Sequence, residues 1–187
     1  MTQKSTMMTT ENTLDSTQEP PKKVKKTRRP RKKASPAATK KLPSNPFMNE
    51  ILELVSEQKT DAKKVAILKE YECDILKSLF IWNFDDSIIS LLPEGKVPYK
   101  PNENPLGTDH SSLRREQRNL YMFVKGGNDA LSTIRRETIF IQMLEGLHPK
   151  EADIIVAVKD GDLEDMYEVP FEVVEEAYPD IQWGGRS

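Results

Sequence analysis

Hydrophobic and polar residues follow a helical period from residue 46 onward. The segment FMNEILELVSEQ places four apolar side chains on one helical face: Phe47, Ile51, Leu54 and Val55. This spacing predicts an amphipathic helix. Pro46 suits the first turn of that helix, because the N–H that proline lacks has no intrahelical partner there, and Asn45 is the expected cap.

The next stretch predicts two more helices and then a loop. One helix begins at about Thr60, and its apolar stripe comprises Val65, Leu68, Ile75, Leu76 and Leu79. In residues 80–92, FIWNFDDSIISLL, a short hydrophobic connection precedes a third helix, with Asp85 and Asp86 at its start, where the helix dipole favours acids. Residues 92–107 contain four prolines and two glycines, so we expect an irregular loop, with Tyr99 either packed on the core or exposed.

The second half of the chain carries further helix signals. Ser111 and Ser112 can begin a helix in SSLRREQRNLYMFVK, and Gly126 and Gly127 are expected to end it in a left-handed cap. The following segment, ALSTIRRETIFIQMLEGL, is strongly apolar at Leu131, Ile134, Ile139, Ile141 and Leu144. We expect a helix there.

The clearest helix signal lies in HPKEADIIVAVKDG. Pro149 fits the first turn, Glu151 and Lys159 complement the two ends of the helix dipole, and Gly161 follows the last turn. FEVVEEAY predicts a last short helix that Pro179 stops. Strict two-residue alternation is short throughout, so any sheet is expected to be small.

These elements predict an all-α, mainly helical fold. We expect a single-domain bundle of about six helices at residues 46–187, preceded by a disordered basic arm at residues 1–45. The arm contains almost no large apolar side chain after the two methionines at 7 and 8, so it cannot bury enough surface to offset the entropy of ordering.

Charge divides the chain at the same place. Residues 1–47 contain 12 lysines and arginines and 3 acids, a net charge of +9, whereas residues 48–187 contain 16 and 27, a net charge of −11. The near-neutral total therefore hides two segments of opposite sign, which suit different partners.

The basic arm is the strongest functional signal in the sequence. Eleven positive residues and no acid occur between residues 22 and 41: Lys22, Lys23, Lys25, Lys26, Arg28, Arg29, Arg31, Lys32, Lys33, Lys40 and Lys41. Such side chains neutralise phosphates and release counterions, so we expect the arm to bind DNA or RNA with little sequence preference. The alternative is a solubilising tail or a loose protein-binding arm.

Two arginine pairs stand within the acidic domain, Arg114 with Arg115 and Arg135 with Arg136. Arginine suits bidentate contact with phosphate or carboxylate. Each pair is next to a glutamate, Glu116 or Glu137, so we expect intramolecular ion pairs across helices.

No pattern in the sequence indicates catalysis, a metal or a cofactor. The only histidines, His110 and His148, are isolated in sequence and lack further ligands at metal-binding spacing; we expect His148 to cap a helix and His110 to be exposed. Cys73 lies in an apolar helical pattern and is expected to be a buried structural thiol. Trp183 is expected to dock on the domain.

The amino-terminal residues lack the apolar run of a signal peptide, and no stretch reaches the 18 or so apolar residues of a membrane span. We therefore expect a soluble, intracellular protein that does not contact a membrane.

Residues 91–183 carry a family resemblance. LLPEGKVPYKPN, RNLYMFVKGGN, LSTIRRETIFIQMLEGLHPKEADIIVAVKDG and EEAYPDIQWG resemble a family of uncharacterised small proteins of T-even-like tailed phages, notably those of marine bacteria and cyanobacteria. The resemblance implies a setting in the cytoplasm of an infected host, or in the virion. It implies no catalytic residues.

Three functional hypotheses follow. The first is a non-enzymatic phage accessory protein, whose arm binds nucleic acid and whose domain docks on a host or phage protein. The second is a minor virion structural or assembly protein, whose arm binds acidic protein surfaces. The third is an enzyme that brings His148, Glu151 and the arginine pairs together in one cleft; scattering of these residues would remove it.

Overall fold

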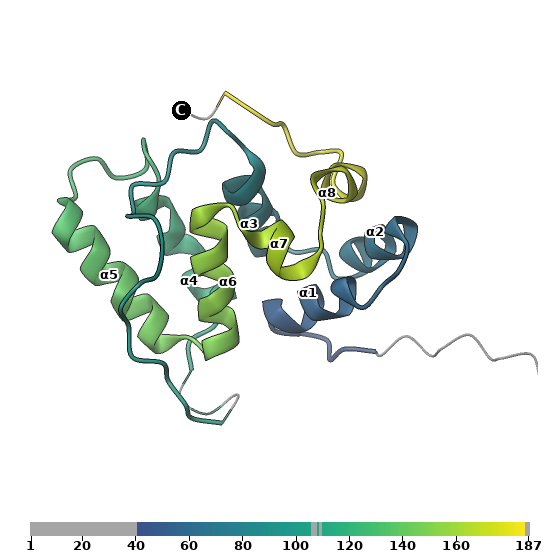
Figure 1. Cartoon of the computed structure of the whole chain (residues 1–187), viewed down its shortest axis with the longest axis horizontal. Helices are drawn as coiled ribbons and strands as arrows, with labels where there is room; N and C mark the ends of the chain where they lie inside the picture. The colour runs from purple at the N-terminus through teal and green to yellow at the C-terminus, as the bar shows by residue number, and fades with distance from the viewer. Residues whose placement is uncertain (1–40, 106–107, 109, 186–187) are drawn as a thin grey trace, which may run out of the picture. The chain divides into compact units, whose positions relative to one another are not determined.

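The helices are assigned from a computed structural model that describes residues 41–105, 108 and 110–185. Residues 1–40 of the predicted disordered arm lie outside the described residues, and of the eleven predicted nucleic-acid-binding residues only Lys41 is described. The described part contains eight α-helices and one 3-10 helix, η1, and no β-strand (Figure 1). The predicted all-α fold is confirmed.

The helices have the following bounds: α1 Met48–Ser56, α2 Asp61–Glu70, α3 Asp74–Phe84, α4 Leu113–Glu116, η1 Gln117–Phe123, α5 Thr133–Gly146, α6 Pro149–Asp160, α7 Leu163–Tyr167 and α8 Phe171–Ala177. Every helix contributes buried apolar side chains to one hydrophobic core. Helix α6 is central, because it packs against α1, α3, α5 and α7, while α2 packs against α1 and α8.

Both ends of α6 and the carboxyl end of α8 follow the sequence signals. His148 caps α6 by accepting a hydrogen bond from the Lys150 N–H, Pro149 opens its first turn, and Gly161 follows it at φ +81°. Helix α8 ends before Pro179, as predicted. Helix α1 lies where its apolar stripe placed it, but its cap is Phe47, so the prediction of Asn45 as the cap is wrong.

The predicted helix from Thr60 to Leu79 is two helices. Thr60 precedes α2, which ends at Glu70, and the half-buried Cys73 precedes α3. All five residues of the predicted stripe are buried, but they belong to helices with different partners, since α2 packs on α8 and α3 packs on α6. The break directs each half of the stripe to a separate part of the core.

The predicted helix beginning at Asp85 is absent from the described residues. Helix α3 continues to Phe84, and Asp85 follows it with extended backbone. The Asp85 carboxylate accepts hydrogen bonds from the N–H of Ser87 at 2.9 Å and of Gly184 at 3.0 Å. The next residues pair with another segment, because Ser90 forms an isolated antiparallel bridge with Val124. The expected loop that follows is confirmed where it is described, and Tyr99 packs on the core.

The segment after Ser112 forms the short α4 and then η1, in place of one long α-helix. Val124 leaves η1 with extended backbone, so Gly126, at φ +82°, lies in a turn beyond the helix and does not cap it. Gly127 passes so close to the 3-10 helix that an added Cβ would lie 1.8 Å from the Tyr121 carbonyl oxygen. Only glycine fits there.

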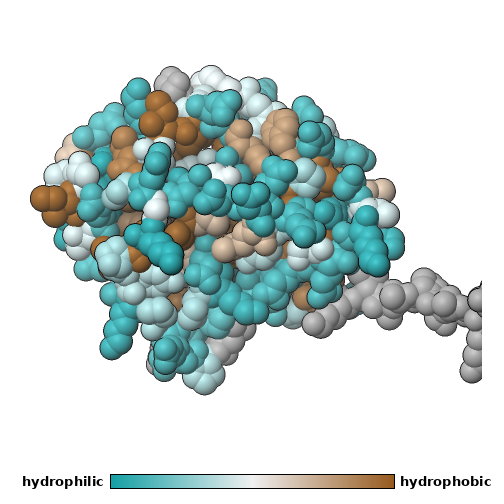
Figure 2. Space-filling view, viewed as in Figure 1, coloured by the Kyte–Doolittle hydropathy of each residue, from teal (hydrophilic) through white to brown (hydrophobic). Residues whose placement is uncertain are grey.

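Helix α5 buries a face that the apolar residues alone did not identify. Phe140, Met143 and Leu144 are buried, as is Arg136, whereas Ile134 is 80% exposed. The apolar character of the segment therefore did not indicate which of its residues are buried. On the face of the molecule shown in Figure 2, hydrophilic residues predominate and hydrophobic ones form small, separate patches.

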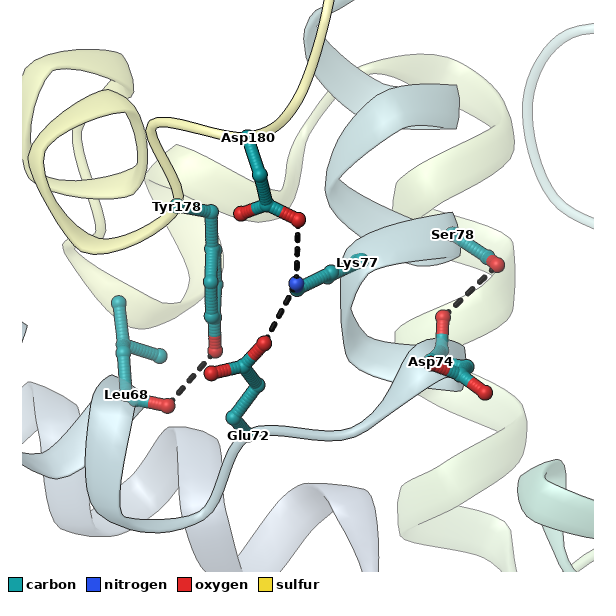
Figure 3. Close-up of polar contacts among 7 residues, drawn as sticks. All are labelled: Leu68, Glu72, Asp74, Lys77, Ser78, Tyr178 and Asp180. Carbon is teal, nitrogen blue, oxygen red and sulfur yellow. Dashed lines mark hydrogen bonds and ion pairs between the residues drawn. The ribbon is translucent and has the colours of Figure 1, made fainter.

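The carboxyl-terminal segment is held on α2 and α3 by polar contacts (Figure 3). Lys77 pairs with Asp180 at 2.7 Å and with Glu72, and the buried Tyr178 hydroxyl donates to the Leu68 carbonyl at 2.8 Å. Burial raises the pKa of Tyr178, which keeps its hydroxyl protonated as a donor. Trp183 docks as predicted, with its ring centroid 5.0 Å from that of Phe171.

Candidate functional site

A groove of about 800 Å³ separates α3 from the α4–η1 segment. One wall is the outer face of α3, and the other begins at Arg114 and ends at Val124. Its lining residues are Ser78, Ile81, Trp82, Ile88, Arg114, Arg115, Gln117, Arg118, Leu120, Tyr121 and Val124. The groove therefore combines aliphatic and aromatic side chains with three arginines.

Hydrogen bonds hold the two walls in place. Between the walls, the Gln117 amide donates to the Ser78 hydroxyl at 3.4 Å. At the end near the Ser90–Val124 bridge, Leu91 N–H donates to the Phe123 carbonyl at 2.8 Å, and Lys125 N–H donates to the Ile89 carbonyl at 2.9 Å. These hydrogen bonds fix the two walls relative to each other, so the groove is part of the folded structure.

Aromatic residues support the apolar part of the groove. Trp82 stacks on Phe123 with ring centroids 6.3 Å apart, and Phe123 in turn contacts Phe140 edge to face at 5.1 Å. The Trp82 indole N–H is buried and has no hydrogen-bond acceptor among the described residues. Tyr121 lies on the same wall as the arginines and is 52% exposed.

The three arginines of the groove are not used in ion pairs within the described part of the chain. Arg114 donates to the Pro46 carbonyl at 3.4 Å, while Arg115 and Arg118 are exposed. The expected partner of the first pair, Glu116, accepts hydrogen bonds from Ser111 and Asn119. All four ion pairs among the described residues use lysine, so the predicted arginine ion pairs are not formed there.

The second arginine pair does not join the groove. Arg136 is 4% exposed and donates from Nε to the Met122 carbonyl at 2.8 Å and from its guanidinium to the Asn128 carbonyl at 2.9 Å. It therefore ties α5 to η1 and to the turn after it. Arg135 is exposed.

A smaller pocket of about 200 Å³ lies where α1, α4 and α6 begin, and the buried Glu151 is one of its lining residues. One Glu151 oxygen accepts from the Met48 N–H at 3.1 Å and the other from the Leu113 N–H at 3.0 Å. Burial raises the pKa of the Glu151 carboxyl, an effect that these two N–H donors and the charge of Arg114 oppose. Glu151 thus caps α1 and α4 from the first turn of α6.

The two histidines, distant in sequence, meet beside this pocket. Their ring centroids are 5.2 Å apart, and a ring nitrogen of His110 is 2.8 Å from the Asn104 carbonyl. His110 is half-buried, so the prediction that it is exposed is wrong. Burial, then the charges of His110 and Lys150, lowers the pKa of His148, with Asp153 acting in the opposite direction.

The residues of the enzyme hypothesis are therefore only partly brought together. Of these residues, Glu151, Arg114 and Arg115 line the small pocket, but its walls do not include His148, Arg135 or Arg136. Both Glu151 oxygens and the His148 Nδ1 are occupied by backbone N–H groups. These side chains organise helix ends in this conformation.

The described residues contain no cluster of three or more histidine, cysteine, aspartate or glutamate side chains arranged to hold a metal ion. None of their helices is long and apolar enough to cross a membrane. Of the predicted nucleic-acid-binding residues, Lys41 alone is described, and its side chain is exposed.

Residues 51–165 match a family model described as a family of unknown function, DUF6433. This match spans more than half of the chain. The chain belongs to the DUF6433 family. Searches of curated proteins and of solved structures found no match.

The residues that match the DUF6433 model include every residue that lines the groove between α3 and the α4–η1 segment. They also include Glu151 and both histidines. The basic residues 22–41 lie outside it. The family membership agrees with the expectation of an uncharacterised family. The groove therefore lies within the part of the chain that matches the family model, and the arm lies outside it.

Sequence spacing contains a signal for the groove that was missed. Arg114, Arg118 and Tyr121 are separated by four and then three residues, the spacing of neighbours on one helical face. The opposite wall could not be found in this way, because α3 comes from a distant part of the sequence.

Proposed function

We propose that this chain is a non-enzymatic, phage-encoded accessory protein. Its basic arm binds nucleic acid without sequence preference, and its acidic helical domain docks on a host or phage protein. The observation that carries the proposal is the division of charge, +9 before residue 48 and −11 from there on. A polyanion is attracted by the first segment and repelled by the second, so the two segments suit different partners.

The phage setting rests on the sequence resemblance over residues 91–183, and it favours the host cytoplasm as the place of action. In a bacterium the basic stretch has no nucleus to address. Phage or host nucleic acid is then the polyanion that the arm would meet most abundantly.

The proposal is non-enzymatic because the polar side chains that gather near Glu151 are engaged in helix capping. A general base or nucleophile needs an atom that can reach a substrate. Glu151 is 1% exposed and bonded through both oxygens, which supports a structural role.

Binding of the full chain to random duplex and single-stranded DNA, measured over a range of salt concentrations, tests the role of the arm. If the arm engages about 6 phosphates, affinity should fall roughly a thousandfold between about 50 and 200 mM salt. The comparison is a full-length variant with the nine lysines and arginines of residues 22–33 replaced by serine.

Steep salt dependence in the natural chain and its loss in the serine variant support the proposal. Equal binding by both chains would place the nucleic-acid contact elsewhere. Failure of the natural chain to bind at about 50 mM salt, where counterion release is strongly favourable, refutes nucleic-acid binding by the arm.

A further inference from the structure

We infer that the groove between α3 and α4–η1 is the docking site for an acidic, amphipathic segment of a partner protein. This inference deepens the proposed function, since it assigns a surface and a chemistry to the protein partner of the helical domain. The occupant is a peptide that presents apolar side chains on one side and aspartate or glutamate at its edges. The inference rests on the walls of the groove, its charge and the state of its arginines.

The apolar part of the groove selects the apolar side chains of the partner. Ile81, Ile88 and Val124 are half-buried, and the Tyr121 ring is half-exposed. Covering such surfaces removes apolar area from water, which is the main favourable term in protein association.

The arginines select the acidic residues of the partner. Arg114, Arg115 and Arg118 are gathered on one wall although the residues from 48 onward carry a net charge of −11. No described acid forms an ion pair with them. Arg115 and Arg118 are also exposed, so these two guanidinium groups are available to a ligand, whereas Arg114 donates to the Pro46 carbonyl. Arginine binds carboxylates in a bidentate geometry, and arginine and tyrosine are the residues that commonly dominate protein interfaces.

The net negative charge of the domain argues for a peptide over a nucleic acid at this groove. A nucleic acid carries a phosphate at every nucleotide, so its whole length would be repelled by the surrounding acids. An amphipathic peptide needs only a few carboxylates beside the arginines, and its apolar side gains from the rest of the groove.

The test is selection from a displayed library of short random peptides with the full-length protein as the target. Peptides are retained if they bind the natural chain and fail to bind a variant with Arg115→Glu and Arg118→Glu. Both side chains are exposed and make no ion pair with a described residue, so this variant should keep its fold. Selected peptides should combine aspartate or glutamate with large apolar residues at helical spacing.

Affinities of the selected peptides are then measured by fluorescence anisotropy. The double charge reversal should weaken binding at least about tenfold, which corresponds to about 1.4 kcal/mol, and Tyr121→Ser should weaken it by a similar factor. The matched controls are Arg135→Glu and Ile134→Ser, an exposed arginine and an exposed isoleucine outside the groove. Both controls should bind as the natural chain does.

The arm provides an independent control, because it is also basic. The serine variant of residues 22–33 should lose DNA binding and keep peptide binding, whereas the groove variants should do the reverse. Failure of DNA binding alone therefore removes the arm function and leaves the groove inference standing. An absence of selected peptides, peptides without acids, or loss of DNA binding in the groove variants would overturn the groove inference.

Discussion

Replacing Glu151 should destabilise the domain more than replacing any exposed acid. Its two oxygens accept the N–H groups of Met48 and Leu113, which begin α1 and α4 and are fully buried. In Glu151→Ala both donors lose their acceptor inside the core. An unsatisfied buried donor costs about 1–3 kcal/mol, so the expected loss is about 2–6 kcal/mol before any cavity is counted.

A loss of this size is a large part of the stability of an ordinary domain, about 5–15 kcal/mol. Glu151→Gln keeps one oxygen acceptor and replaces the other with an amide that cannot accept. It should cost about 1–3 kcal/mol, because one N–H stays bonded. Replacing the carboxylate also removes the free-energy cost of burying its charge, a cost that is reflected in the raised pKa of Glu151.

Urea unfolding followed by circular dichroism measures these differences as shifts in the midpoint at an unchanged slope. Glu175→Ala is the matched control, since Glu175 is an exposed acid on α8, and its effect should stay within about 0.5 kcal/mol. An effect of Glu151→Ala no larger than that of the control would refute the capping role. Equal effects of alanine and glutamine would show that hydrogen bonding to the two N–H groups is not the cause.

Two further predictions concern His148 and Arg136. Because the pKa of His148 is lowered in the folded protein, the unfolded chain takes up the proton first, so stability should fall as the pH drops below about 6.5. His148→Asn keeps a side-chain cap and should lessen this fall in stability. Urea midpoints measured at neutral and at mildly acidic pH check this expectation. Identical pH dependence in the natural chain and the variant would contradict the role of His148. Arg136→Met removes the charged donor that bonds the carbonyls of the half-buried Met122 and Asn128, and it should cost about 2–4 kcal/mol in urea unfolding. The neighbouring Arg135→Met should cost almost nothing, and equal costs would exclude the carbonyl contacts as the cause.

Helices whose signals are local could be predicted from the sequence. Helix α6 has its cap, its proline and its terminal glycine within one continuous segment, and all three act as predicted. The stripes of α1 and α2 likewise consist of neighbours on one face. Such features depend on contacts between residues three or four positions apart, and this spacing can be seen directly in the sequence.

Features that depend on distant partners could not be predicted. Nothing in the sequence interrupts the stripe between Glu70 and Asp74, yet the chain breaks there because α2 and α3 pack on different helices. Asp85 resembles a helix start, but its carboxylate binds Gly184, which lies 99 positions away. Arg136 can lie on the buried face of α5 because two carbonyls outside that helix accept its hydrogen bonds.

The candidate site likewise combines features that can be predicted from the sequence with features that only the tertiary structure shows. The sequence by itself determined the division of charge, the helical class and the spacing that aligns Arg114, Arg118 and Tyr121 on one side of a segment. The tertiary structure decided that α3 faces this segment across a groove, and that Glu151 and His148 serve as caps. The physical reason is that helical spacing arises from local backbone geometry, whereas a groove or a buried cap forms only when separate helices are packed together.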